Sequence, residues 1–249
     1  MTRAAPATDI PELTVVIPAY NEAENIPVVV REAIAVLEGP SGLSSYQLVL
    51  VDDGSTDGSP AIMDALASPV VTVVHHARNR GFGAALRTGY AAARGRYVTL
   101  ITGDGEIGVD QPLALLAAMG KADLMISRRV RPADASRTLF STLFGWLTRV
   151  MTGFDAAEMS GIYVIRREVL HAMPLRSETG VVNFEIVIRA TRAGCAIVSG
   201  WTTVRPRLSG SSKVTNARTM LKVALELVKL RIGIVTERWQ AAKGGSRLD

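Results

Sequence analysis

The sequence predicts an α/β fold, in which a Rossmann-like, mostly parallel sheet carries helices on both faces. Between residues 13 and 102, four short aliphatic runs alternate with segments of helical periodicity. A chain of 249 residues that is 48% hydrophobic supplies an ample core for one large domain, or for one domain with a small appendage. The aliphatic runs also end in turns rich in aspartate and glycine, which is typical of the ligand-binding edge of such sheets.

The elements of the first half follow from their residue types. The strands are runs of valine, leucine and isoleucine, and the helices between them have apolar residues at helical spacing. We expect Pro18 to end the first strand, because proline has no backbone N–H to donate. In order, the predicted elements are a strand at Leu13–Ile17, a helix at Ile26–Leu37, a strand at Gln47–Val51, a helix reaching Leu66, a strand at Val70–Val74, a helix at Ala84–Ala93 and a strand at Tyr97–Thr102.

Two carboxylates follow the fourth predicted strand. Asp104 and Glu106 come directly after the strand stops at Gly103, and a second glycine separates them. Carboxylates at positions i and i+2 of a bent turn can point to one place and hold Mg²⁺ or Mn²⁺. The alternative is an acidic turn with both side chains in water, and the spacing alone does not decide between the two.

Acidic residues also follow the first two strands. Asp52 and Asp53 end the second strand, and Glu22 comes soon after the first. A strand-end carboxylate can accept hydrogen bonds from a nucleobase or a ribose. The other interpretation is capping of the next helix, which we expect from the Ser-Thr-Asp stretch at 55–57. Together with Asp104, these acids outline a site for a metal-bound nucleotide at one edge of the sheet.

A glycine pair precedes the third helix. Gly81 and Gly83 could belong to a dinucleotide-binding fingerprint, but the next glycine is Gly89, so the G-x-G-x-x-G spacing fails. We therefore predict that these glycines allow a close backbone fit at the helix start.

Three segments resemble the family 2 glycosyltransferases: Val16-Ile-Pro-Ala-Tyr-Asn-Glu22, Val49-Leu-Val-Asp-Asp-Gly-Ser-Thr-Asp-Gly58 and Arg80-Gly-Phe-Gly-Ala-Ala85. Within that family the chain is most similar to the dolichyl- or polyprenyl-phosphate mannose or glucose synthases, in a form without transmembrane helices. The resemblance implies a GT-A type fold over 13–215, after a flexible N-terminus at 1–12 and before a C-terminal helix and polar tail at 216–249. By this resemblance, the residues that contact the nucleotide-sugar donor are Pro18, Tyr20, Glu22, Asp52, Asp53 and Asp104.

The sequence departs from the family pattern in two places. The family's D-x-D falls on Thr102-Gly-Asp104, so the first aspartate is missing, and Glu106 stands where glutamine is usual. The metal is then predicted on Asp104 and Glu106. Ile162 and Tyr163 replace the Phe and Arg of the family's Ser-Gly-Phe-Arg segment, which predicts sugar selection different from that of the mannose enzymes.

The second half of the chain is basic. Residues 1–125 hold 8 basic and 14 acidic residues, whereas residues 126–249 hold 20 and 9. A Ser/Gly loop between Arg207 and Lys213 offers guanidinium, hydroxyl, backbone N–H and ammonium donors, a set that suits a phosphate. A solvated loop is the alternative, but the resemblance favours an acceptor-phosphate site made of Arg128, Arg207, Ser212 and Lys213. We count three of these, Arg128, Arg207 and Lys213, as catalytic together with Asp104.

Three further helices and a fifth strand, Ala122–Ile126, are predicted in this half. The segment 137–149 has three aromatics between two arginines, which indicates either a helix at a membrane interface or a buried core helix. Glu185, in a helix from Phe184 to Ala193, either faces the sugar or pairs with a neighbouring arginine. The final helix, Ala217–Gln240, could dock on the domain, lie on a membrane or pack against a second copy in a homo-oligomer.

These observations predict a metal-dependent, inverting hexosyltransferase that uses a nucleotide-sugar of the GDP-mannose or UDP-glucose type and a polyprenyl phosphate acceptor. The alternatives are transfer to a hydroxyl of a lipid or glycan, or a non-catalytic basic protein. Nucleic acid is not an expected partner, because no helix is uniformly basic. We expect a cytoplasmic protein at the cytoplasmic face of a membrane, since Met1–Asp9 has no apolar signal region and Cys195 has no intramolecular disulfide partner.

Overall fold

The computed structural model describes residues 10–39, 43–130, 149, 162–203 and 217–236. In this part of the chain, seven strands form one sheet in the order β3-β2-β1-β4-β6-β5-β7. Its pairings are parallel except those of β6, which runs antiparallel to β4 and β5. The predicted mostly parallel sheet is therefore confirmed. The strands are β1 Leu13–Ala19, β2 Tyr46–Asp52, β3 Val71–His75, β4 Tyr97–Leu100, β5 Leu124–Val130, β6 Tyr163–Arg166 and β7 Ile197–Thr203.

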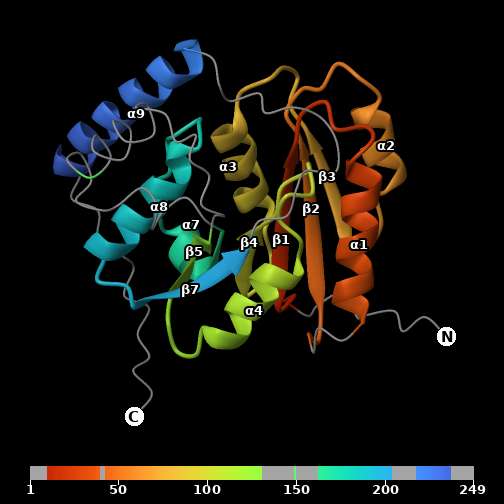
Figure 1. The fold of residues 1–249 in the computed structure, drawn as a ribbon, viewed down its shortest axis with the longest axis horizontal. Coiled ribbons are helices and arrows are strands. Elements are labelled where there is room, and N and C mark those ends of the chain that lie inside the picture. The colour runs from red at the N-terminus through yellow and green to blue at the C-terminus, as the bar shows by residue number, and fades with distance from the viewer. Residues whose placement is uncertain (1–9, 40–42, 131–148, 150–161, 204–216, 237–249) are drawn as a thin grey trace.

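Helices cover both faces of this sheet, as predicted (Figure 1). Helices α1 and α2 lie together on one face, and α3 packs on the other face against β1 and β2. Helix α9 lies along α8 at one side of the domain. The helices of the described residues are α1 Ile26–Glu38, α2 Ser59–Ala65, α3 Phe82–Ala92, α4 Asp110–Ala118, α7 Arg167–His171, α8 Val181–Arg192 and α9 Ala217–Thr236.

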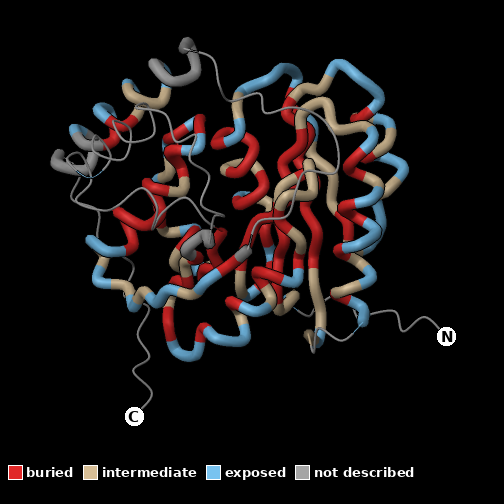
Figure 2. Tube along the Cα trace, viewed as in Figure 1, coloured by how far each residue is buried: buried red, intermediate tan, exposed pale blue. Residues whose placement is uncertain are grey.

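The central strands are the most deeply buried part of the domain (Figure 2). Strand β1 is buried along its whole length. Helix α3 packs tightly on the sheet at Gly89, where an added Cβ atom would lie 2.3 Å from Cγ1 of Val16 and 3.2 Å from Cγ2 of Val51. A side chain at this position would push α3 away from β1 and β2, so glycine fixes the distance between the helix and the strands.

One prediction about β1 is wrong, because the strand does not end at Pro18. Pro18 pairs with Val51, and Ala19 pairs with Asp52. The carbonyl of Val16 accepts from the N–H of Ile101 on the β4 side, whereas the carbonyl of Ala19 accepts from Asp53 on the β2 side. Pro18 therefore faces the β4 side, where the pairing has already ended at Val16 and Leu100. The missing N–H of proline costs no ladder hydrogen bond there.

The part of the chain after β4 differs more from prediction. Helices α4 and α7 and strands β6 and β7 are absent from the predicted elements, and the predicted fifth strand at Ala122–Ile126 is found at Leu124–Val130. The final helix begins at Ala217 as predicted and is described as far as Thr236. Within the described residues, no helix combines the length and the apolar character needed to cross a membrane.

Candidate functional site

The carboxyl ends of the parallel strands meet at one edge of the sheet. Ala19 of β1, Asp52 of β2 and His75 of β3 stand side by side in the register of the sheet. After β4, Gly103 comes so close to β1 that its Cβ would lie 3.1 Å from both the carbonyl oxygen of Pro18 and Cβ of Ala19. The chain around Gly103 therefore lies against the end of β1, and this brings the Asp104 turn to the same edge as Asp52.

Asp52 is a buried, ionised carboxylate. Its side chain is 3% exposed, its Oδ1 accepts the N–H of Ser55 at 2.9 Å, and its Oδ2 bonds Nδ1 of His75 at 3.0 Å. Burial alone would raise the pKa of Asp52, but the hydrogen bonds from His75 and Ser55 outweigh it and hold the pKa below its ordinary value. Asp52 is thus an anion at neutral pH, at the place predicted to receive a base or a ribose.

Asp53, the next residue, holds a loop. Its Oδ1 bonds Nδ1 of His76 at 2.7 Å and accepts the N–H of Arg80 at 2.9 Å, and its Oδ2 accepts the N–H of Gly81 at 2.8 Å. The carboxylate therefore ties β2 to the turn that precedes α3. Its predicted contact with a nucleotide stays a prediction, but the described partners give Asp53 a structural role.

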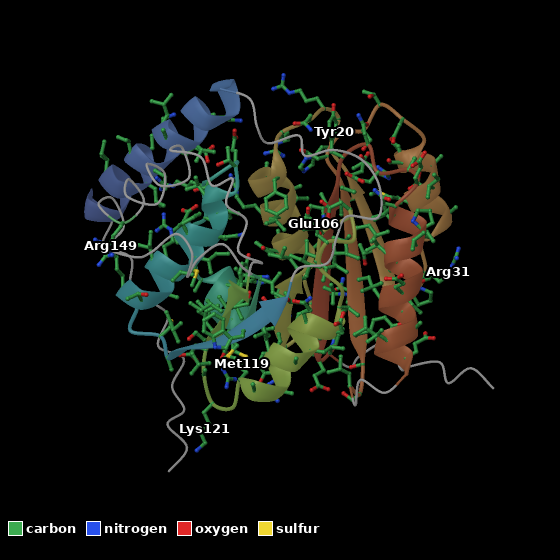
Figure 3. The ribbon with its side chains drawn as sticks, viewed as in Figure 1. Tyr20, Arg31, Glu106, Met119, Lys121 and Arg149 are labelled. Carbon is green, nitrogen blue, oxygen red and sulfur yellow. The ribbon has the colours of Figure 1, made fainter. Side chains whose placement is uncertain are left out.

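The Ser-Thr-Asp stretch after β2 binds the loop after β1. The Oγ atom of Ser55 accepts the N–H of Asn21 at 2.9 Å, and the N–H of Thr56 donates to Oδ1 of Asn21 at 2.8 Å. The expected side-chain cap is not found, because the N-cap of α2 is Gly58; Asp57, the residue before it, accepts the N–H of Ser59 through Oδ1 at 2.9 Å. Asn21 has a positive φ of 54°. These bonds hold the loop that carries Tyr20 in a defined shape, and Figure 3 shows Tyr20 at this end of the sheet.

The glycine pair at the start of α3, Gly81 and Gly83, fits a neighbouring backbone, as predicted. The N–H of Gly83 donates to the carbonyl of Glu178 at 2.9 Å, and a Cβ on Gly83 would lie 2.4 Å from the carbonyl oxygen of Thr179. A Cβ on Gly81, which has a φ of 100°, would lie 2.7 Å from the carbonyl oxygen of Glu178. The glycines join the start of α3 to the turn before α8.

The predicted metal ligands Asp104 and Glu106 lie in a tight turn after β4, and Figure 3 labels Glu106. Gly105 has a φ of 75°, and the N–H of Glu106 donates to Oδ1 of Asp104 at 3.1 Å. Among the described residues there is no cluster of three or more metal-ligating side chains. Two carboxylates still fit Mg²⁺ or Mn²⁺ when substrate phosphates and waters complete the coordination, because such ions are commonly held that way. The buried Thr102 hydroxyl has no hydrogen-bond partner within the described residues.

Glu185, in the second half of the sequence, has a structural role. Glu185 is fully buried, and it accepts the backbone N–H groups of Arg176 and Ser177 and Nε–H of Arg189 at 2.9 Å. It therefore pairs with an arginine, which is one of the two expectations.

Tyr163 is buried in β6, where its hydroxyl bonds the hydroxyl of Tyr90. Burial raises the pKa of Tyr163 above its ordinary value, so the hydroxyl stays neutral. Tyr163, which stands where the resemblance places an arginine, thus lies in the core.

The predicted acceptor-phosphate residues lie mostly outside the described part of the chain. Arg207, Ser212 and Lys213 fall within 204–216, and the predicted membrane segment is described only at Arg149, which is helical and exposed. Arg128 lies on β5, in register with Trp201 of β7.

Sequence reasoning missed two histidines. His75 bonds Asp52 and, through Nε2, Oδ1 of Asp64 at 3.0 Å, while Nε2 of His76 bonds the hydroxyl of Thr88 at 2.8 Å. The signal that could have revealed them is the consecutive histidine pair at the end of the third strand.

Comparison with known proteins places the chain among sugar-transferring enzymes. The family model described as glycosyl transferase family 2 matches residues 14–168. The polyprenol monophosphomannose synthase of Mycolicibacterium smegmatis is 31% identical, over 84% of this chain and 84% of that protein. The succinoglycan biosynthesis protein ExoO of Rhizobium meliloti is 37% identical over 43% of this chain, and the match spans only 29% of that longer protein.

The fold is also found in a solved structure. Glucosyl-3-phosphoglycerate synthase from Mycobacterium tuberculosis, in complex with Mn²⁺, uridine diphosphate and glucosyl-3-phosphoglycerate, superposes with a TM-score of 0.66 at 23% identity. The superposition covers 93% of this chain and 87% of that one. At this identity the likeness shows the same α/β architecture.

Proposed function

The chain belongs to glycosyl transferase family 2, and from that premise we propose that it transfers a hexose from a nucleotide-sugar to a polyprenyl phosphate. The observation that carries the acceptor is the likeness to polyprenol monophosphomannose synthase, which extends over 84% of both chains. The proposed reaction inverts the anomeric centre, with the acceptor oxygen attacking as the bond to the nucleoside diphosphate breaks. GDP-mannose and UDP-glucose are the donor types to test.

The donor half of the proposal is supported by the edge of the sheet. Asp52 is buried and ionised, and its carboxylate can accept N–H or O–H donors from a base or a ribose. The hydrogen-bonded loop that carries Tyr20 and Glu22, together with Pro18 at the end of β1, supplies the rest of the proposed base and ribose contacts. Hydrogen bonds within the protein fix these loops, so little ordering remains to be done when the donor binds.

The metal half rests on the turn after β4. We assign Asp104 and Glu106 as the residues that would hold a divalent cation beside the donor diphosphate, and a structural neighbour in complex with Mn²⁺ and uridine diphosphate supports the choice of ion. When bound, such an ion neutralises negative charge on the departing nucleoside diphosphate. The turn that carries Asp104 lies close to the end of β1, because Gly103, the residue before Asp104, approaches Pro18 and Ala19.

The acceptor assignment follows from proton chemistry. A hydroxyl acceptor must lose a proton during attack and normally needs a carboxylate or histidine as base. A phosphate monoester is largely anionic already near pH 7, because its second pKa is about 6. Glu185 cannot supply a free base, since it is buried and holds Arg189. We assign the acceptor phosphate to Arg128, Arg207, Ser212 and Lys213, with no obligatory base.

Peripheral contact with the cytoplasmic face of a membrane completes the proposal, because the acceptor is a lipid. The segment 137–149 is one proposed contact. Helix α9 supports a second: Leu225, Val228 and Ile232 are exposed, and they follow one another at helical spacing on one side. The buried residues Leu227 and Leu230 lie on a different side of α9.

The charges of α9 favour an anionic surface as its partner. Glu226, the only acidic residue of the helix, accepts the Thr179 hydroxyl at 2.6 Å and so faces the domain. Lys222 and Lys229 are exposed. A helix with exposed aliphatic residues beside lysines is typical of segments that lie in a membrane interface.

The test is transfer of labelled sugar into a lipid extract. Purified protein is mixed with Mn²⁺, labelled GDP-mannose or UDP-glucose, and either polyprenyl phosphate or the matching polyprenol, whose terminal hydroxyl replaces the phosphate. We expect acid-labile labelled lipid with the phosphate alone. Lys213→Ala should raise the KM for lipid phosphate and leave the KM for the donor nearly unchanged, while Arg31→Ala, an exposed change on α1, is the control. Label in the polyprenol sample alone would show that the acceptor is a hydroxyl.

A further inference from the structure

A surface aspartate outside the proposed donor site is linked to that site through one imidazole ring. His75 lies between Asp52 of β2 and Asp64 of α2, with 3.0 Å from Nδ1 to Oδ2 of Asp52 and 3.0 Å from Nε2 to Oδ1 of Asp64. The side chains are exposed by 3% at Asp52, 35% at His75 and 67% at Asp64. The three groups thus run from the buried edge of the sheet to solvent.

The geometry defines the charge of the ring. An ionised carboxylate only accepts hydrogen bonds, so each ring nitrogen that faces one must carry a proton. Both bonds exist together only when the ring is an imidazolium cation. The two hydrogen bonds to Asp52 and Asp64 also raise the pKa of His75 above its ordinary value. These two carboxylates are the charged groups that face the ring from β2 and α2, because the neighbouring His76 bonds Asp53 and Thr88 instead.

The ring in turn fixes Asp52. Oδ1 of Asp52 accepts from the backbone of Ser55, and Oδ2 accepts from His75, so the carboxylate is held at both oxygens. Its remaining lone pairs have one orientation, which a donor ligand must match. When the ring loses a proton, one nitrogen presents a lone pair to a carboxylate, and one of the two bonds is lost.

We propose that Asp64 is a positioning residue for nucleotide binding, which acts by keeping His75 doubly protonated and thereby fixing the carboxylate of Asp52. The inference rests on the proposed donor site and adds to it a residue that touches no substrate. It also gives the binding step a pH dependence. Affinity for the nucleotide should be full while His75 is protonated and should fall as the pH rises through the pKa of His75.

The variants are Asp64→Ala and, as a charge control, Glu32→Gln on the exposed face of α1. Removing Asp64 removes one of the two hydrogen bonds that favour the imidazolium, so the ring should lose its proton at a lower pH. Below the histidine range, both Asp64→Ala and wild type should bind nucleotide equally. In the window between their two transitions, Asp64→Ala should bind about tenfold more weakly for each unit by which its transition has moved. Asp64→Glu keeps a carboxylate, so its transition should lie closer to that of wild type than the transition of Asp64→Ala does.

Two measurements separate this inference from the proposed function. The first is a side-chain ¹⁵N–¹H titration of the histidines between about pH 5.5 and 8.5, with His75 assigned from His75→Gln. Wild-type His75 should show two protonated nitrogens above pH 6.5, the usual pKa of histidine being about 6.5, and Asp64→Ala should titrate lower. The second is calorimetric titration with UDP and with GDP, each with Mn²⁺, over the same range.

The outcomes are distinct. If His75 titrates alike in wild type, Asp64→Ala and Glu32→Gln, the inference is wrong even when nucleotide binds. If the ring titration shifts but nucleotide affinity has the same pH profile in all three, His75 is structural and the inference is again wrong. If neither UDP nor GDP binds wild type at any pH, the proposed donor site fails and takes the inference with it. A matched shift in both measurements supports it.

Discussion

Replacing Asp53 with asparagine should destabilise the protein far more than replacing its exposed neighbour Asp57. The Asp53 side chain is 5% exposed and accepts from Arg80, Gly81 and His76, with both oxygens occupied. Asparagine keeps one acceptor oxygen and turns the other position into an NH₂ donor. Wherever the amide places that NH₂ group, it meets a backbone N–H that had been donating to the carboxylate.

The magnitude follows from that exchange. A hydrogen bond to a charged group contributes about 1.5–3 kcal/mol, and a buried donor left without an acceptor costs about 1–3 kcal/mol. Asp53→Asn should therefore lower the free energy of unfolding by about 3–5 kcal/mol, a large part of the roughly 5–15 kcal/mol typical of domains. Asp57 is exposed and accepts from Ala23 and Ser59. Asp57→Asn should cost no more than about 1 kcal/mol.

Urea unfolding followed by circular dichroism at fixed pH measures both variants. The midpoint of the Asp53→Asn transition should move well below those of wild type and Asp57→Asn, with a similar slope. Calorimetry with UDP or GDP below that midpoint then reports the donor site. An Asp53→Asn protein as stable as Asp57→Asn would refute the reasoning. A stable variant that no longer binds nucleotide would assign Asp53 to the donor instead of the loop.

Three further changes test other parts of the molecule. Asp104→Asn, or chelation of the cation, should lower turnover by removing at least about 3 kcal/mol of transition-state stabilisation. Circular dichroism should show that the fold stays intact. Full turnover without metal would contradict the assignment. Gly83→Ala should destabilise the protein by about 1–3 kcal/mol in urea unfolding, because its Cβ would lie 2.4 Å from a backbone oxygen. Gly180→Ala, with open space around it, should be neutral or slightly stabilising. Equal effects of the two changes would contradict the backbone-fit argument. Changing Leu225 and Ile232 together to serine should weaken flotation with vesicles rich in anionic lipid, and unchanged flotation would remove α9 from the membrane contact.

The first half of the fold could be predicted from the sequence because its elements are strongly patterned. Strands β1 and β2 are continuous aliphatic runs, and the acidic turns that follow them mark the edge of the sheet. The second half lacks such runs. Strand β6 passes directly into α7 at Arg166–Arg167 without a turn residue between them. Strand β7 is an edge strand with Ser199, Gly200 and an exposed Trp201, so it has no continuous apolar run to reveal it.

The roles of the acidic residues can also be predicted only in part from the sequence. The sequence identifies which residues can accept hydrogen bonds, but it does not say which donors the fold brings to them. Glu185 shows this, because its sequence context allows both a sugar contact and an arginine pair, and only the fold brings the buried Arg189 and the N–H groups of Arg176 and Ser177 to it. Two of those donors are backbone groups, which leave no trace in the residue pattern.

The contacts of Asp52-Asp53 with His75-His76 could be predicted from the sequence if the register between β2 and β3 were known. Side chains alternate between the faces of a strand, so consecutive residues serve opposite sides of the sheet. Since Asp52 pairs with His75, the next residues along, Asp53 and His76, also meet, at 2.7 Å between Oδ1 and Nδ1. The first pair reaches Asp64 on α2 and the second reaches Thr88 on α3, and these helices lie on opposite faces. The same two residue types are therefore used twice, once where His75 links the buried Asp52 to the exposed Asp64 and once where Asp53 holds the chain that starts α3. Register is a long-range property of β2 and β3, and neither strand encodes it alone.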